Sequence, residues 1–231
     1  MSSVLVVAGG VVLLNLYALV LVLLRAPLFR TVLYRPMVLN IALSVAPAGV
    51  LVLAGLGMLA AIALSSSLLL WTVLIVCGLV WLLFLPNSAY LITELNFSHR
   101  KQDEAVPLWY DIALVLSLAL SGVLNTLLNT LLVQTLYVLL RYPNDPEPLH
   151  RAESWVLVAV VLVLVTFGMY LGRYLRFNTW DITHPASFAG KLAGHFRTRG
   201  RIGEALGFCA VHTVLLAVMY LVVVAPAVDL L

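Results

Sequence analysis

The sequence predicts an all-α integral membrane bundle of six transmembrane helices, with an amphipathic interfacial helix before the last of them. The chain is 63% hydrophobic and only 10% charged, whereas a soluble domain carries roughly 25% charged residues. Its apolar runs are each about as long as a bilayer crossing, which takes roughly 20 residues. Lipid offers the backbone no hydrogen-bond partners, so each run must be a helix. The whole chain is expected to form one transmembrane domain over residues 1–231, with helices at about 4–24, 37–64, 68–85, 108–140, 155–175 and 204–228.

The first two predicted helices contain polar residues and prolines that interrupt their apolar sequence. Asn15 is the one strongly polar residue of the first run, and it is expected to bond a neighbouring helix rather than a ligand. Pro36 suits the start of the second helix, because its missing amide donor costs nothing there. Pro47 lies in the interior of that helix and should kink it. The second helix also carries residues that allow a neighbour to approach closely, namely Gly49, Gly55 and Gly57.

The third helix follows a very short turn at residues 65–67, so helices two and three should form an antiparallel hairpin. Pro86 is expected to end this helix, with Asn87 capping the backbone groups that it leaves free. Residues 88–96 then form either a short interfacial helix or a kinked continuation of helix three. Residues 96–105 are polar and charged, and are interpreted as a solvated loop.

The fourth helix is unusually long, so it should be tilted, bent or overhanging. Polar side chains recur along it at every fourth residue and therefore lie on one stripe, formed by Ser117, Ser121, Asn125 and Asn129. This stripe is interpreted first as interhelical hydrogen bonding, with the lining of a pathway as the alternative.

An amphipathic segment precedes the sixth helix. Pro185 is placed to open a helix whose apolar face is formed by Phe188, Leu192 and Phe196. Another face is basic and carries Lys191, His195 and Arg199. This pattern predicts a helix that lies on a membrane surface.

The distribution of basic residues predicts the orientation of the chain. With six crossings, the connections after helices one, three and five lie on one side. With the adjoining helix ends they hold Arg25, Arg30, Arg35, Arg100, Lys101, Arg173, Arg176, Lys191, Arg197, Arg199 and Arg201. The opposite side holds only Arg141 and Arg151. Because an excess of Lys and Arg marks the cytoplasmic face, both termini are expected outside.

Two regions are unusually polar for such a chain, the first at residues 85–111 and the second at residues 172–181. The topology places both on the cytoplasmic side, at the end of helix three, the start of helix four and the end of helix five. A carboxylate near the membrane gains by finding a partner, so Arg173 or Arg176 could pair with an acid of this group. The ligand-binding hypothesis comprises Asn87, Tyr90, Thr93, Glu94, Trp109, Asp111, Arg173, Asn178, Trp180 and Asp181.

These residue types suit several kinds of chemistry. Arginine forks match the oxygens of a phosphate or carboxylate, and the acids could ligate a divalent cation or transfer a proton. The alternative is structural, with interfacial aromatic residues and ion pairs that lock the helix ends. Familiar catalytic motifs are absent, and the histidines and cysteines lack metal-site spacing. No catalytic residue, cofactor or metal is therefore assigned, and the sparse basic residues give nucleic-acid binding no support.

Three motifs carry a resemblance to a known family: Leu85-Pro86-Asn87-x-x-Tyr90-x-x-Thr93, Val106-Pro107-Leu108-Trp109-Tyr110-Asp111, and Gly172-Arg173 followed by Asn178-x-Trp180-Asp181. In order and spacing they resemble bacterial multi-pass membrane proteins catalogued as domain of unknown function 1361, over residues 70–225 or so. The resemblance implies a bacterial inner-membrane location and no established activity. The family typically has an aspartate where Glu94 stands, so the acidic group is kept here but reaches further.

The sequence thus predicts a multi-pass inner-membrane protein whose polar pocket at the cytoplasmic interface binds an anionic or amphiphilic small molecule or a lipid head group. Whether the protein is an enzyme is left open. A small transporter is the first alternative, favoured by Pro47, the polar stripe and His212 within helix six. The second is a non-enzymatic assembly or scaffold protein, which would have an exposed small-residue face and no pocket.

Overall fold

The computed structural model describes residues 2–33, 35–95, 106–175 and 185–228. In these residues the backbone forms helices and no β-strand: α1 (Ser2–Phe29), α2 (Arg35–Ala63), α3 (Ser67–Tyr90), η1 (Leu91–Leu95), α4 (Leu108–Arg141), η2 (Pro148–His150), α5 (Ala152–Tyr174), α7 (Pro185–Arg197), α8 (Arg201–Val223) and α9 (Ala225–Val228). Six helices of the described chain are long and apolar enough to cross a membrane. The predicted all-α membrane bundle is thereby confirmed.

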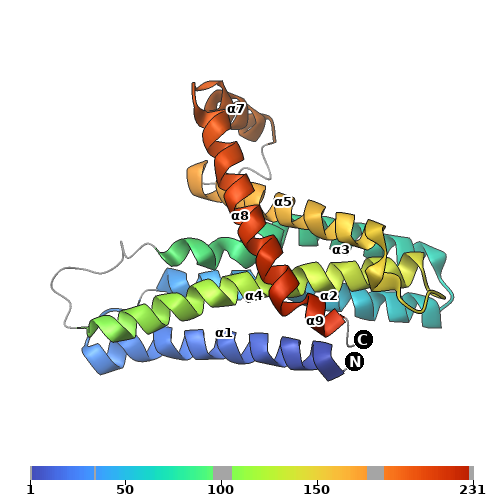
Figure 1. Cartoon of the computed structure of the whole chain (residues 1–231), viewed down its shortest axis with the longest axis horizontal. Coiled ribbons are helices and arrows are strands. Elements are labelled where there is room, and N and C mark those ends of the chain that lie inside the picture. The colour runs from blue at the N-terminus through green and yellow to red at the C-terminus, as the bar shows by residue number, and fades with distance from the viewer. Residues whose placement is uncertain (1, 34, 96–105, 176–184, 229–231) are drawn as a thin grey trace.

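The first five long helices run along the longest axis of the molecule and pack against one another (Figure 1). Successive helices run in opposite directions, so the α1–α2 connection and the start of α4 lie at one end. The α2–α3 turn, the α4–α5 connection and both termini lie at the other end. α8 crosses the bundle steeply, and its first turns project from one side together with α7.

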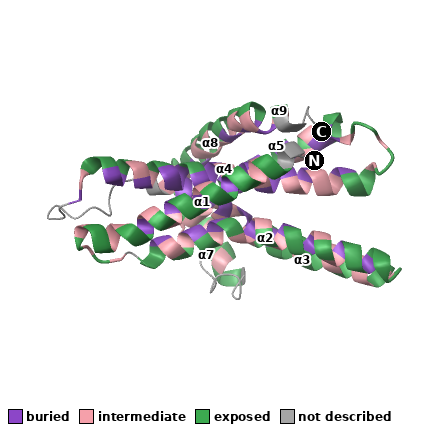
Figure 2. Cartoon of the chain, turned by 90° about the horizontal axis from the view of Figure 1, so that it is seen from below, coloured by how far each residue is buried: buried purple, intermediate pink, exposed green. Residues whose placement is uncertain are grey.

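α4 is the central helix of the bundle. It packs against α1, α2, α3, α5 and α8. In its most apolar stretch 61% of the residues are buried, compared with 11% to 39% in the other five candidate spans. The outer faces of α2 and α3 are exposed in Figure 2, and their exposed side chains include Leu53, Leu59, Trp71, Leu79 and Leu83. Such faces are suited to contact with lipid.

The structure corrects the predicted end of the third helix. α3 continues through Pro86 and Asn87 to Tyr90, and the 3-10 turn η1 follows directly. Asn87 is therefore a residue within the helix rather than a cap. For residues 88–96, the described part is a continuation of α3 that tightens into η1, which agrees with the second of the two alternatives.

One local feature accommodates Pro86 inside a helix. Gly168 of α5 leaves room for the proline ring, because a Cβ at that position would lie 2.2 Å from Pro86 Cγ. Two residues after the proline, Ser88 Oγ donates a hydrogen bond of 2.7 Å to the carbonyl oxygen of Leu85. The proline thus becomes a packing surface between α3 and α5.

Helix one is also longer than predicted, since α1 continues past residue 24 to Phe29 and includes Arg25 and Pro27. Arg25 is accommodated within the helix because Asp111 of α4 accepts a hydrogen bond from it. Of the glycines in α2, Gly57 allows the expected close approach, since a Cβ there would lie 2.9 Å from a methyl group of Val73 in α3.

A methyl group added at Gly168 should force α3 and α5 apart. We expect Gly168→Ala to lower the free energy of unfolding by about 1–3 kcal/mol, the usual cost of overpacking. Gly78→Ala is the matched control, because a Cβ at Gly78 of α3 has nothing within 4 Å, and alanine is the better helix former. Equilibrium unfolding in mixed detergent micelles measures both, and equal stability of the two variants would contradict the packing argument.

Candidate functional site

The stripe of polar side chains on α4 is used in hydrogen bonds between helices. Asn15 Nδ2 of α1 donates to Asn125 Oδ1 at 2.8 Å, and Asn125 Nδ2 donates back to Asn15 Oδ1 at 3.0 Å. Asn125 Nδ2 also donates to Ser44 Oγ of α2 at 2.8 Å. Ser44 Oγ in turn donates to the carbonyl oxygen of Ser88 in α3 at 2.8 Å. One network therefore joins four helices, and the prediction that Asn15 bonds a neighbouring helix is confirmed.

The same kind of contact continues toward the other end of α4. Asn129 Oδ1 accepts a hydrogen bond of 3.2 Å from the indole N–H of Trp81 in α3. Gln134 donates to Ser154 Oγ of α5 at 3.0 Å and accepts from the hydroxyl of Tyr220 in α8. The amide side chains of Asn129 and Gln134 therefore bond α4 to α3, α5 and α8.

The serines of the stripe are buried as well. Ser117 Oγ donates to the carbonyl oxygen of Leu114 at 2.8 Å, and Ser121 Oγ has no hydrogen-bond partner among the described residues. Every residue of the stripe is 4% exposed or less. His212, which also favoured a transporter, contacts the carbonyl oxygen of Phe208 in its own helix at 2.8 Å. The two asparagines of the stripe thus agree with interhelical bonding, and the burial of all four side chains gives no support to a lined pathway.

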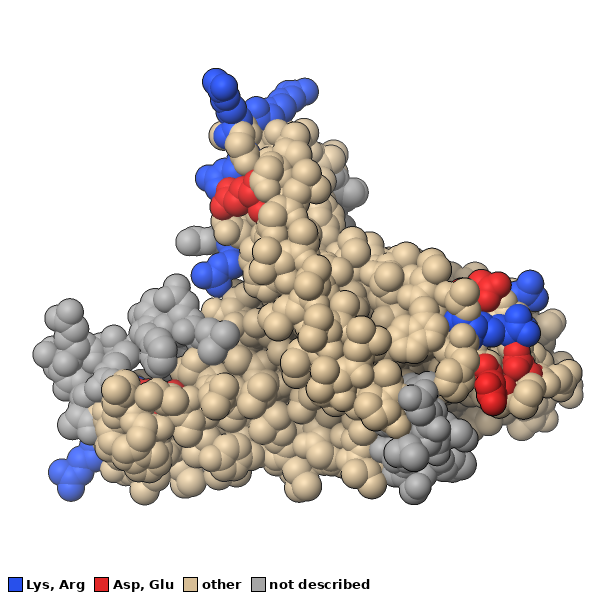
Figure 3. All heavy atoms as spheres, viewed as in Figure 1, with Lys and Arg blue, Asp and Glu red and all other residues tan. Residues whose placement is uncertain are grey.

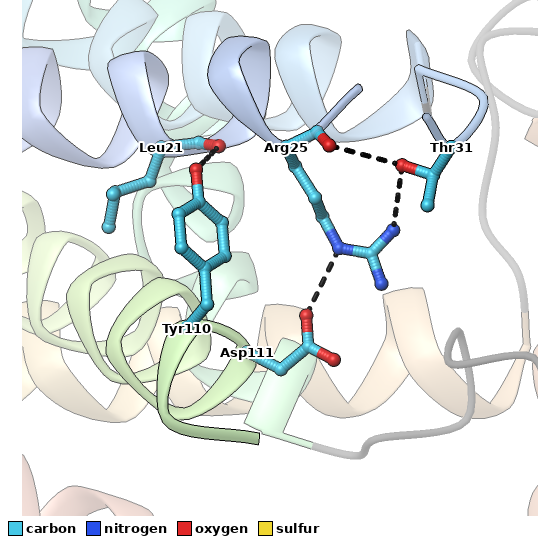
Figure 4. A network of polar contacts seen from close by, with 5 residues as sticks. All are labelled: Leu21, Arg25, Thr31, Tyr110 and Asp111. Atoms are coloured by element: carbon cyan, nitrogen blue, oxygen red, sulfur yellow. Dashed lines mark hydrogen bonds and ion pairs between the residues drawn. The ribbon is translucent and has the colours of Figure 1, made fainter. Parts of the chain in front are cut away.

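Asp111 forms a buried ion pair with Arg25 of α1 (Figure 4). Arg25 Nε donates to Asp111 Oδ1 at 3.0 Å, and only 4% of Asp111 is exposed. Arg25 Nη1 lies 3.5 Å from Thr31 Oγ1, which donates to the carbonyl oxygen of Arg25 at 3.3 Å. Beside the pair, the hydroxyl of Tyr110 donates to the carbonyl oxygen of Leu21 at 2.7 Å. Together these contacts tie the end of α1 to the start of α4.

Arg25 is a functional-site neighbour that sequence reasoning missed. From the sequence, Arg173 or Arg176 of helix five was predicted to pair with an acid of this group such as Asp111, whereas Asp111 pairs with an arginine of helix one. Topology was the available signal, because Arg25 closes the first run and Asp111 opens the fourth at the same end of the bundle. A single sequence does not say which helices are neighbours at that end.

The ends of α3 and α5 bring three other predicted site residues together. Arg173 Nη1 lies 3.5 Å from the carbonyl oxygen of Thr93. Thr93 Oγ1 donates to the carbonyl oxygen of Tyr90 at 2.7 Å, and the Tyr90 ring approaches Gly172, where a Cβ would lie 3.9 Å from it. Arg173 is exposed. An exposed guanidinium thus stands beside the end of η1, with fork nitrogens suited to an oxyanion.

Asp111 and this second group occupy different levels of the bundle. η1 packs on Gly122 of α4, where a Cβ would lie 3.0 Å from the backbone nitrogen of Ile92. Asp111 precedes Gly122 by eleven residues, which is about three turns or roughly 16 Å along the helix. The acid therefore belongs to the joint between α1 and α4, and Arg173 belongs to the rim formed by α3 and α5.

The remaining predicted site residues do not form a single cluster among the described residues. Trp109 is 66% exposed and contacts Tyr110 edge-on at 5.6 Å, as suits an aromatic residue at a membrane border. Asn87 is half-buried in α3, and Glu94 lies in η1. The other three lie outside the described residues, namely Asn178, Trp180 and Asp181. The described chain holds no group of three or more His, Cys, Asp or Glu placed to bind a metal ion.

The amphipathic helix α7 is held next to this rim by an aromatic contact. The hydroxyl of Tyr170 in α5 lies 2.8 Å from His195 Nε2 of α7. The Tyr170 ring also stacks on Tyr174 at 4.5 Å and packs against Phe208 of α8 at 5.7 Å. Since Tyr170 and Arg173 are three residues apart on α5, they are neighbours on one helix face. The docked basic helix therefore stands close to the exposed arginine.

Charged side chains occur at the extremities of the molecule (Figure 3). Lys and Arg gather on the tip that α7 and α8 form, which contains Lys191, Arg197, Arg199 and Arg201. Acids and arginines are mixed at the end that carries the α4–α5 connection, and the middle of this face is uncharged. We call the first feature the basic tip.

Removing the acid of the buried ion pair should destabilise the protein. Breaking a buried pair costs about 3–5 kcal/mol, so we expect Asp111→Asn to lower the free energy of unfolding by that order. Glu204→Gln is the control, because its partner Arg201 and Glu204 itself are 42% and 38% exposed, and exposed pairs contribute less than about 1 kcal/mol. Chemical unfolding in micelles distinguishes the two, and a small loss for both variants would refute a structural role for Asp111.

Replacing Asn125 should also destabilise the protein, because it removes hydrogen bonds between helices. Asn125→Leu keeps the volume but removes the bonds to Asn15 and Ser44, each worth about 0.6 kcal/mol and up to about 1.7 kcal/mol inside a membrane. We expect a total loss of about 2 kcal/mol. Thr72→Val serves as the control, because Thr72 is exposed and bonds only the Leu68 carbonyl of its own helix. Unfolding curves that are identical for these two variants would argue against the network.

The comparison with known proteins identifies the family. A family model described as a protein of unknown function (DUF1361) matches residues 39–222, from the first turns of α2 to the end of α8. No curated protein and no solved structure matches the chain. The matched stretch covers most of the chain and includes the ends of α3, α4 and α5 that carry the motifs. The chain therefore belongs to the DUF1361 family of proteins of unknown function.

Proposed function

We propose that this chain is a protein of the bacterial cytoplasmic membrane that binds an anionic or amphiphilic small molecule, or a lipid head group, at its cytoplasmic end. The observation that carries the proposal is the position of Arg173. Its guanidinium is exposed beside the Thr93 carbonyl, one turn from Tyr170, which holds the basic helix α7. A fixed cation next to further cations attracts an anion and orients it.

The distribution of charge supports an orientation with both termini outside. The α1–α2 connection and the adjoining helix ends carry Arg25, Arg30 and Arg35, and the basic tip adds its own Lys and Arg. At the opposite end the bases are Arg141 and Arg151. The positive-inside rule then assigns the basic end to the cytoplasm.

The length of α4 is consistent with such a placement. Its 34 residues span about 51 Å at 1.5 Å per residue, whereas the hydrocarbon core is roughly 30 Å thick. The α1–α2 connection and the basic tip are both charged, so both should lie outside the hydrocarbon core. The cytoplasmic surface of the bilayer should therefore pass close to both of them. Since α4 runs along the long axis and α8 crosses the bundle steeply (Figure 1), this placement tilts both helices from the bilayer normal, and tilt is how an overlong helix is accommodated.

Within the site, four of the predicted residues have a proposed role. Arg173 binds the anion, and the Tyr90 ring and Thr93 form the surface against which the ligand rests. Asp111 supports the site from a distance, because its ion pair with Arg25 fixes the start of α4. Trp109 contacts Tyr110 at the start of α4, beside Asp111 and away from the rim. Five other residues of the hypothesis stay candidates for the rim: Asn87, Glu94, Asn178, Trp180 and Asp181.

Binding of decyl phosphate to the full chain in non-ionic detergent tests this function. This probe combines an oxyanion with an apolar tail, and isothermal titration calorimetry measures its dissociation constant. Loss of a charge-assisted hydrogen bond is worth about 1.5–3 kcal/mol, so Arg173→Gln should weaken binding by about tenfold or more. Because Arg173 is exposed, the variant should unfold at the same denaturant concentration as the unmodified protein.

Arg35→Gln is the matched control for this measurement. Arg35 is an exposed arginine in the first turn of α2, outside the rim formed by α3 and α5, and its loss should leave binding of decyl phosphate unchanged. If Arg173→Gln and Arg35→Gln weaken binding equally, the attraction comes from overall charge and the proposed site is wrong.

A further inference from the structure

A second candidate site lies at the opposite end of the bundle, where α4 ends and α5 begins. A hollow of about 480 Å³ opens there, lined by Arg141, Tyr142, Asn144, Asp145 and Arg151 together with two prolines. Two arginines, a tyrosine and an amide line one hollow, and guanidinium and amide groups are donors suited to an anion. This region does not overlap the cytoplasmic rim, and the inference does not depend on the proposed function.

The arginines are arranged around the ring of Tyr142. Arg151 Cζ lies 4.3 Å and Arg141 Cζ 5.6 Å from the centre of that ring. Asp145 accepts a hydrogen bond from Arg151 Nε and another of 3.0 Å from the backbone N–H of Glu147. These bonds lower the pKa of the Asp145 carboxyl group and raise the pKa of Arg151. Arg151 is thus held in place through Nε, and its terminal amino groups remain as further donors.

The hollow lies at a membrane border. It joins the ends of two candidate spans, Leu108–Arg141 and Ala152–Tyr174. Large apolar side chains next to it on both helices are exposed: Leu139 is 61%, Leu140 44% and Val156 62% exposed. A ligand bound here contacts charged side chains at one end and an apolar surface at the other. A phospholipid matches both, because it has a charged head group and apolar acyl chains.

We propose that this hollow binds the phosphodiester group of a phospholipid, with Arg141 and Arg151 on the phosphate and the acyl chains along α4 and α5. The local charge favours this ligand over inorganic phosphate. Residues 141–153 carry two arginines but also Asp145, Glu147 and Glu153. A diester with one negative charge meets less repulsion from these acids than a phosphate dianion, and only the lipid also covers the apolar surface.

Photolabelling of the full chain in non-ionic detergent tests the proposal. The probe is a phosphatidylethanolamine that carries a diazirine on its head-group nitrogen, and mass spectrometry of the digested protein locates the label. We expect label on residues 142–151, and Arg141→Gln should reduce it by about tenfold. Arg141 is exposed and takes part in no ion pair among the described residues, so this variant should keep the helical circular dichroism of the unmodified protein. Excess dioctanoyl phosphatidylglycerol should compete with the probe, and sodium phosphate should not.

Two control variants test whether the labelling of the hollow depends on arginines elsewhere in the bundle. Arg35→Gln and Arg173→Gln, both at the other end of the bundle, should leave the label on residues 142–151 unchanged. Equal labelling of Arg141→Gln and the unmodified protein would show mere proximity to detergent-dissolved lipid and would overturn the proposal. Competition by sodium phosphate as strong as that by the lipid would also overturn it, in favour of a free oxyanion.

Discussion

The reciprocal amide pair between Asn15 and Asn125 is the contact on which the arrangement of the bundle depends. Inside a membrane, apolar side chains gain little by leaving lipid for another helix, so they specify neighbours weakly. A buried amide is different, because its alternatives in hydrocarbon are unsatisfied donors and acceptors. Asn125 meets this requirement with α1 and, through Ser44, with α2. These bonds fix both the rotation of each helix and its depth relative to α4.

The central position of α4 follows from the same constraint. Asn129 and Gln134 need partners on α3, α5 and α8, so α4 is surrounded rather than exposed to lipid. Since these polar groups bond one another, the interior of the bundle holds the helices together and leaves ligand chemistry to the helix ends. The cations that remain exposed lie at those ends, which is where both proposed binding sites are located.

Much of this fold was predictable from composition, because apolar runs long enough to cross a bilayer have few alternatives to a helix. The stripe on α4 was predictable from its spacing, since residues four apart share a face. The course of the chain at Pro86 was not. Whether a proline ends a helix depends on what faces its ring, and Gly168 lies eighty-two residues away in the sequence. The partner of Asp111 was unpredictable for a similar reason, because the predicted topology put Arg25 and the arginines of helix five on the same side of the membrane, and the ion pair forms with Arg25.

The separation of Asp111 from Arg173 bears on the kind of chemistry this rim supports. An acid placed beside the arginine would allow proton transfer or cation binding as readily as anion binding. Asp111 instead is occupied by Arg25 and buried about three turns of α4 from the level of Ile92. The side chains described at the rim therefore present a cation, an aromatic ring and a hydroxyl group beside backbone carbonyl groups, and Glu94 of η1 follows Thr93 there. Such a surface favours an anion with an apolar portion, and the basic tip beside it strengthens that preference by raising the local positive potential.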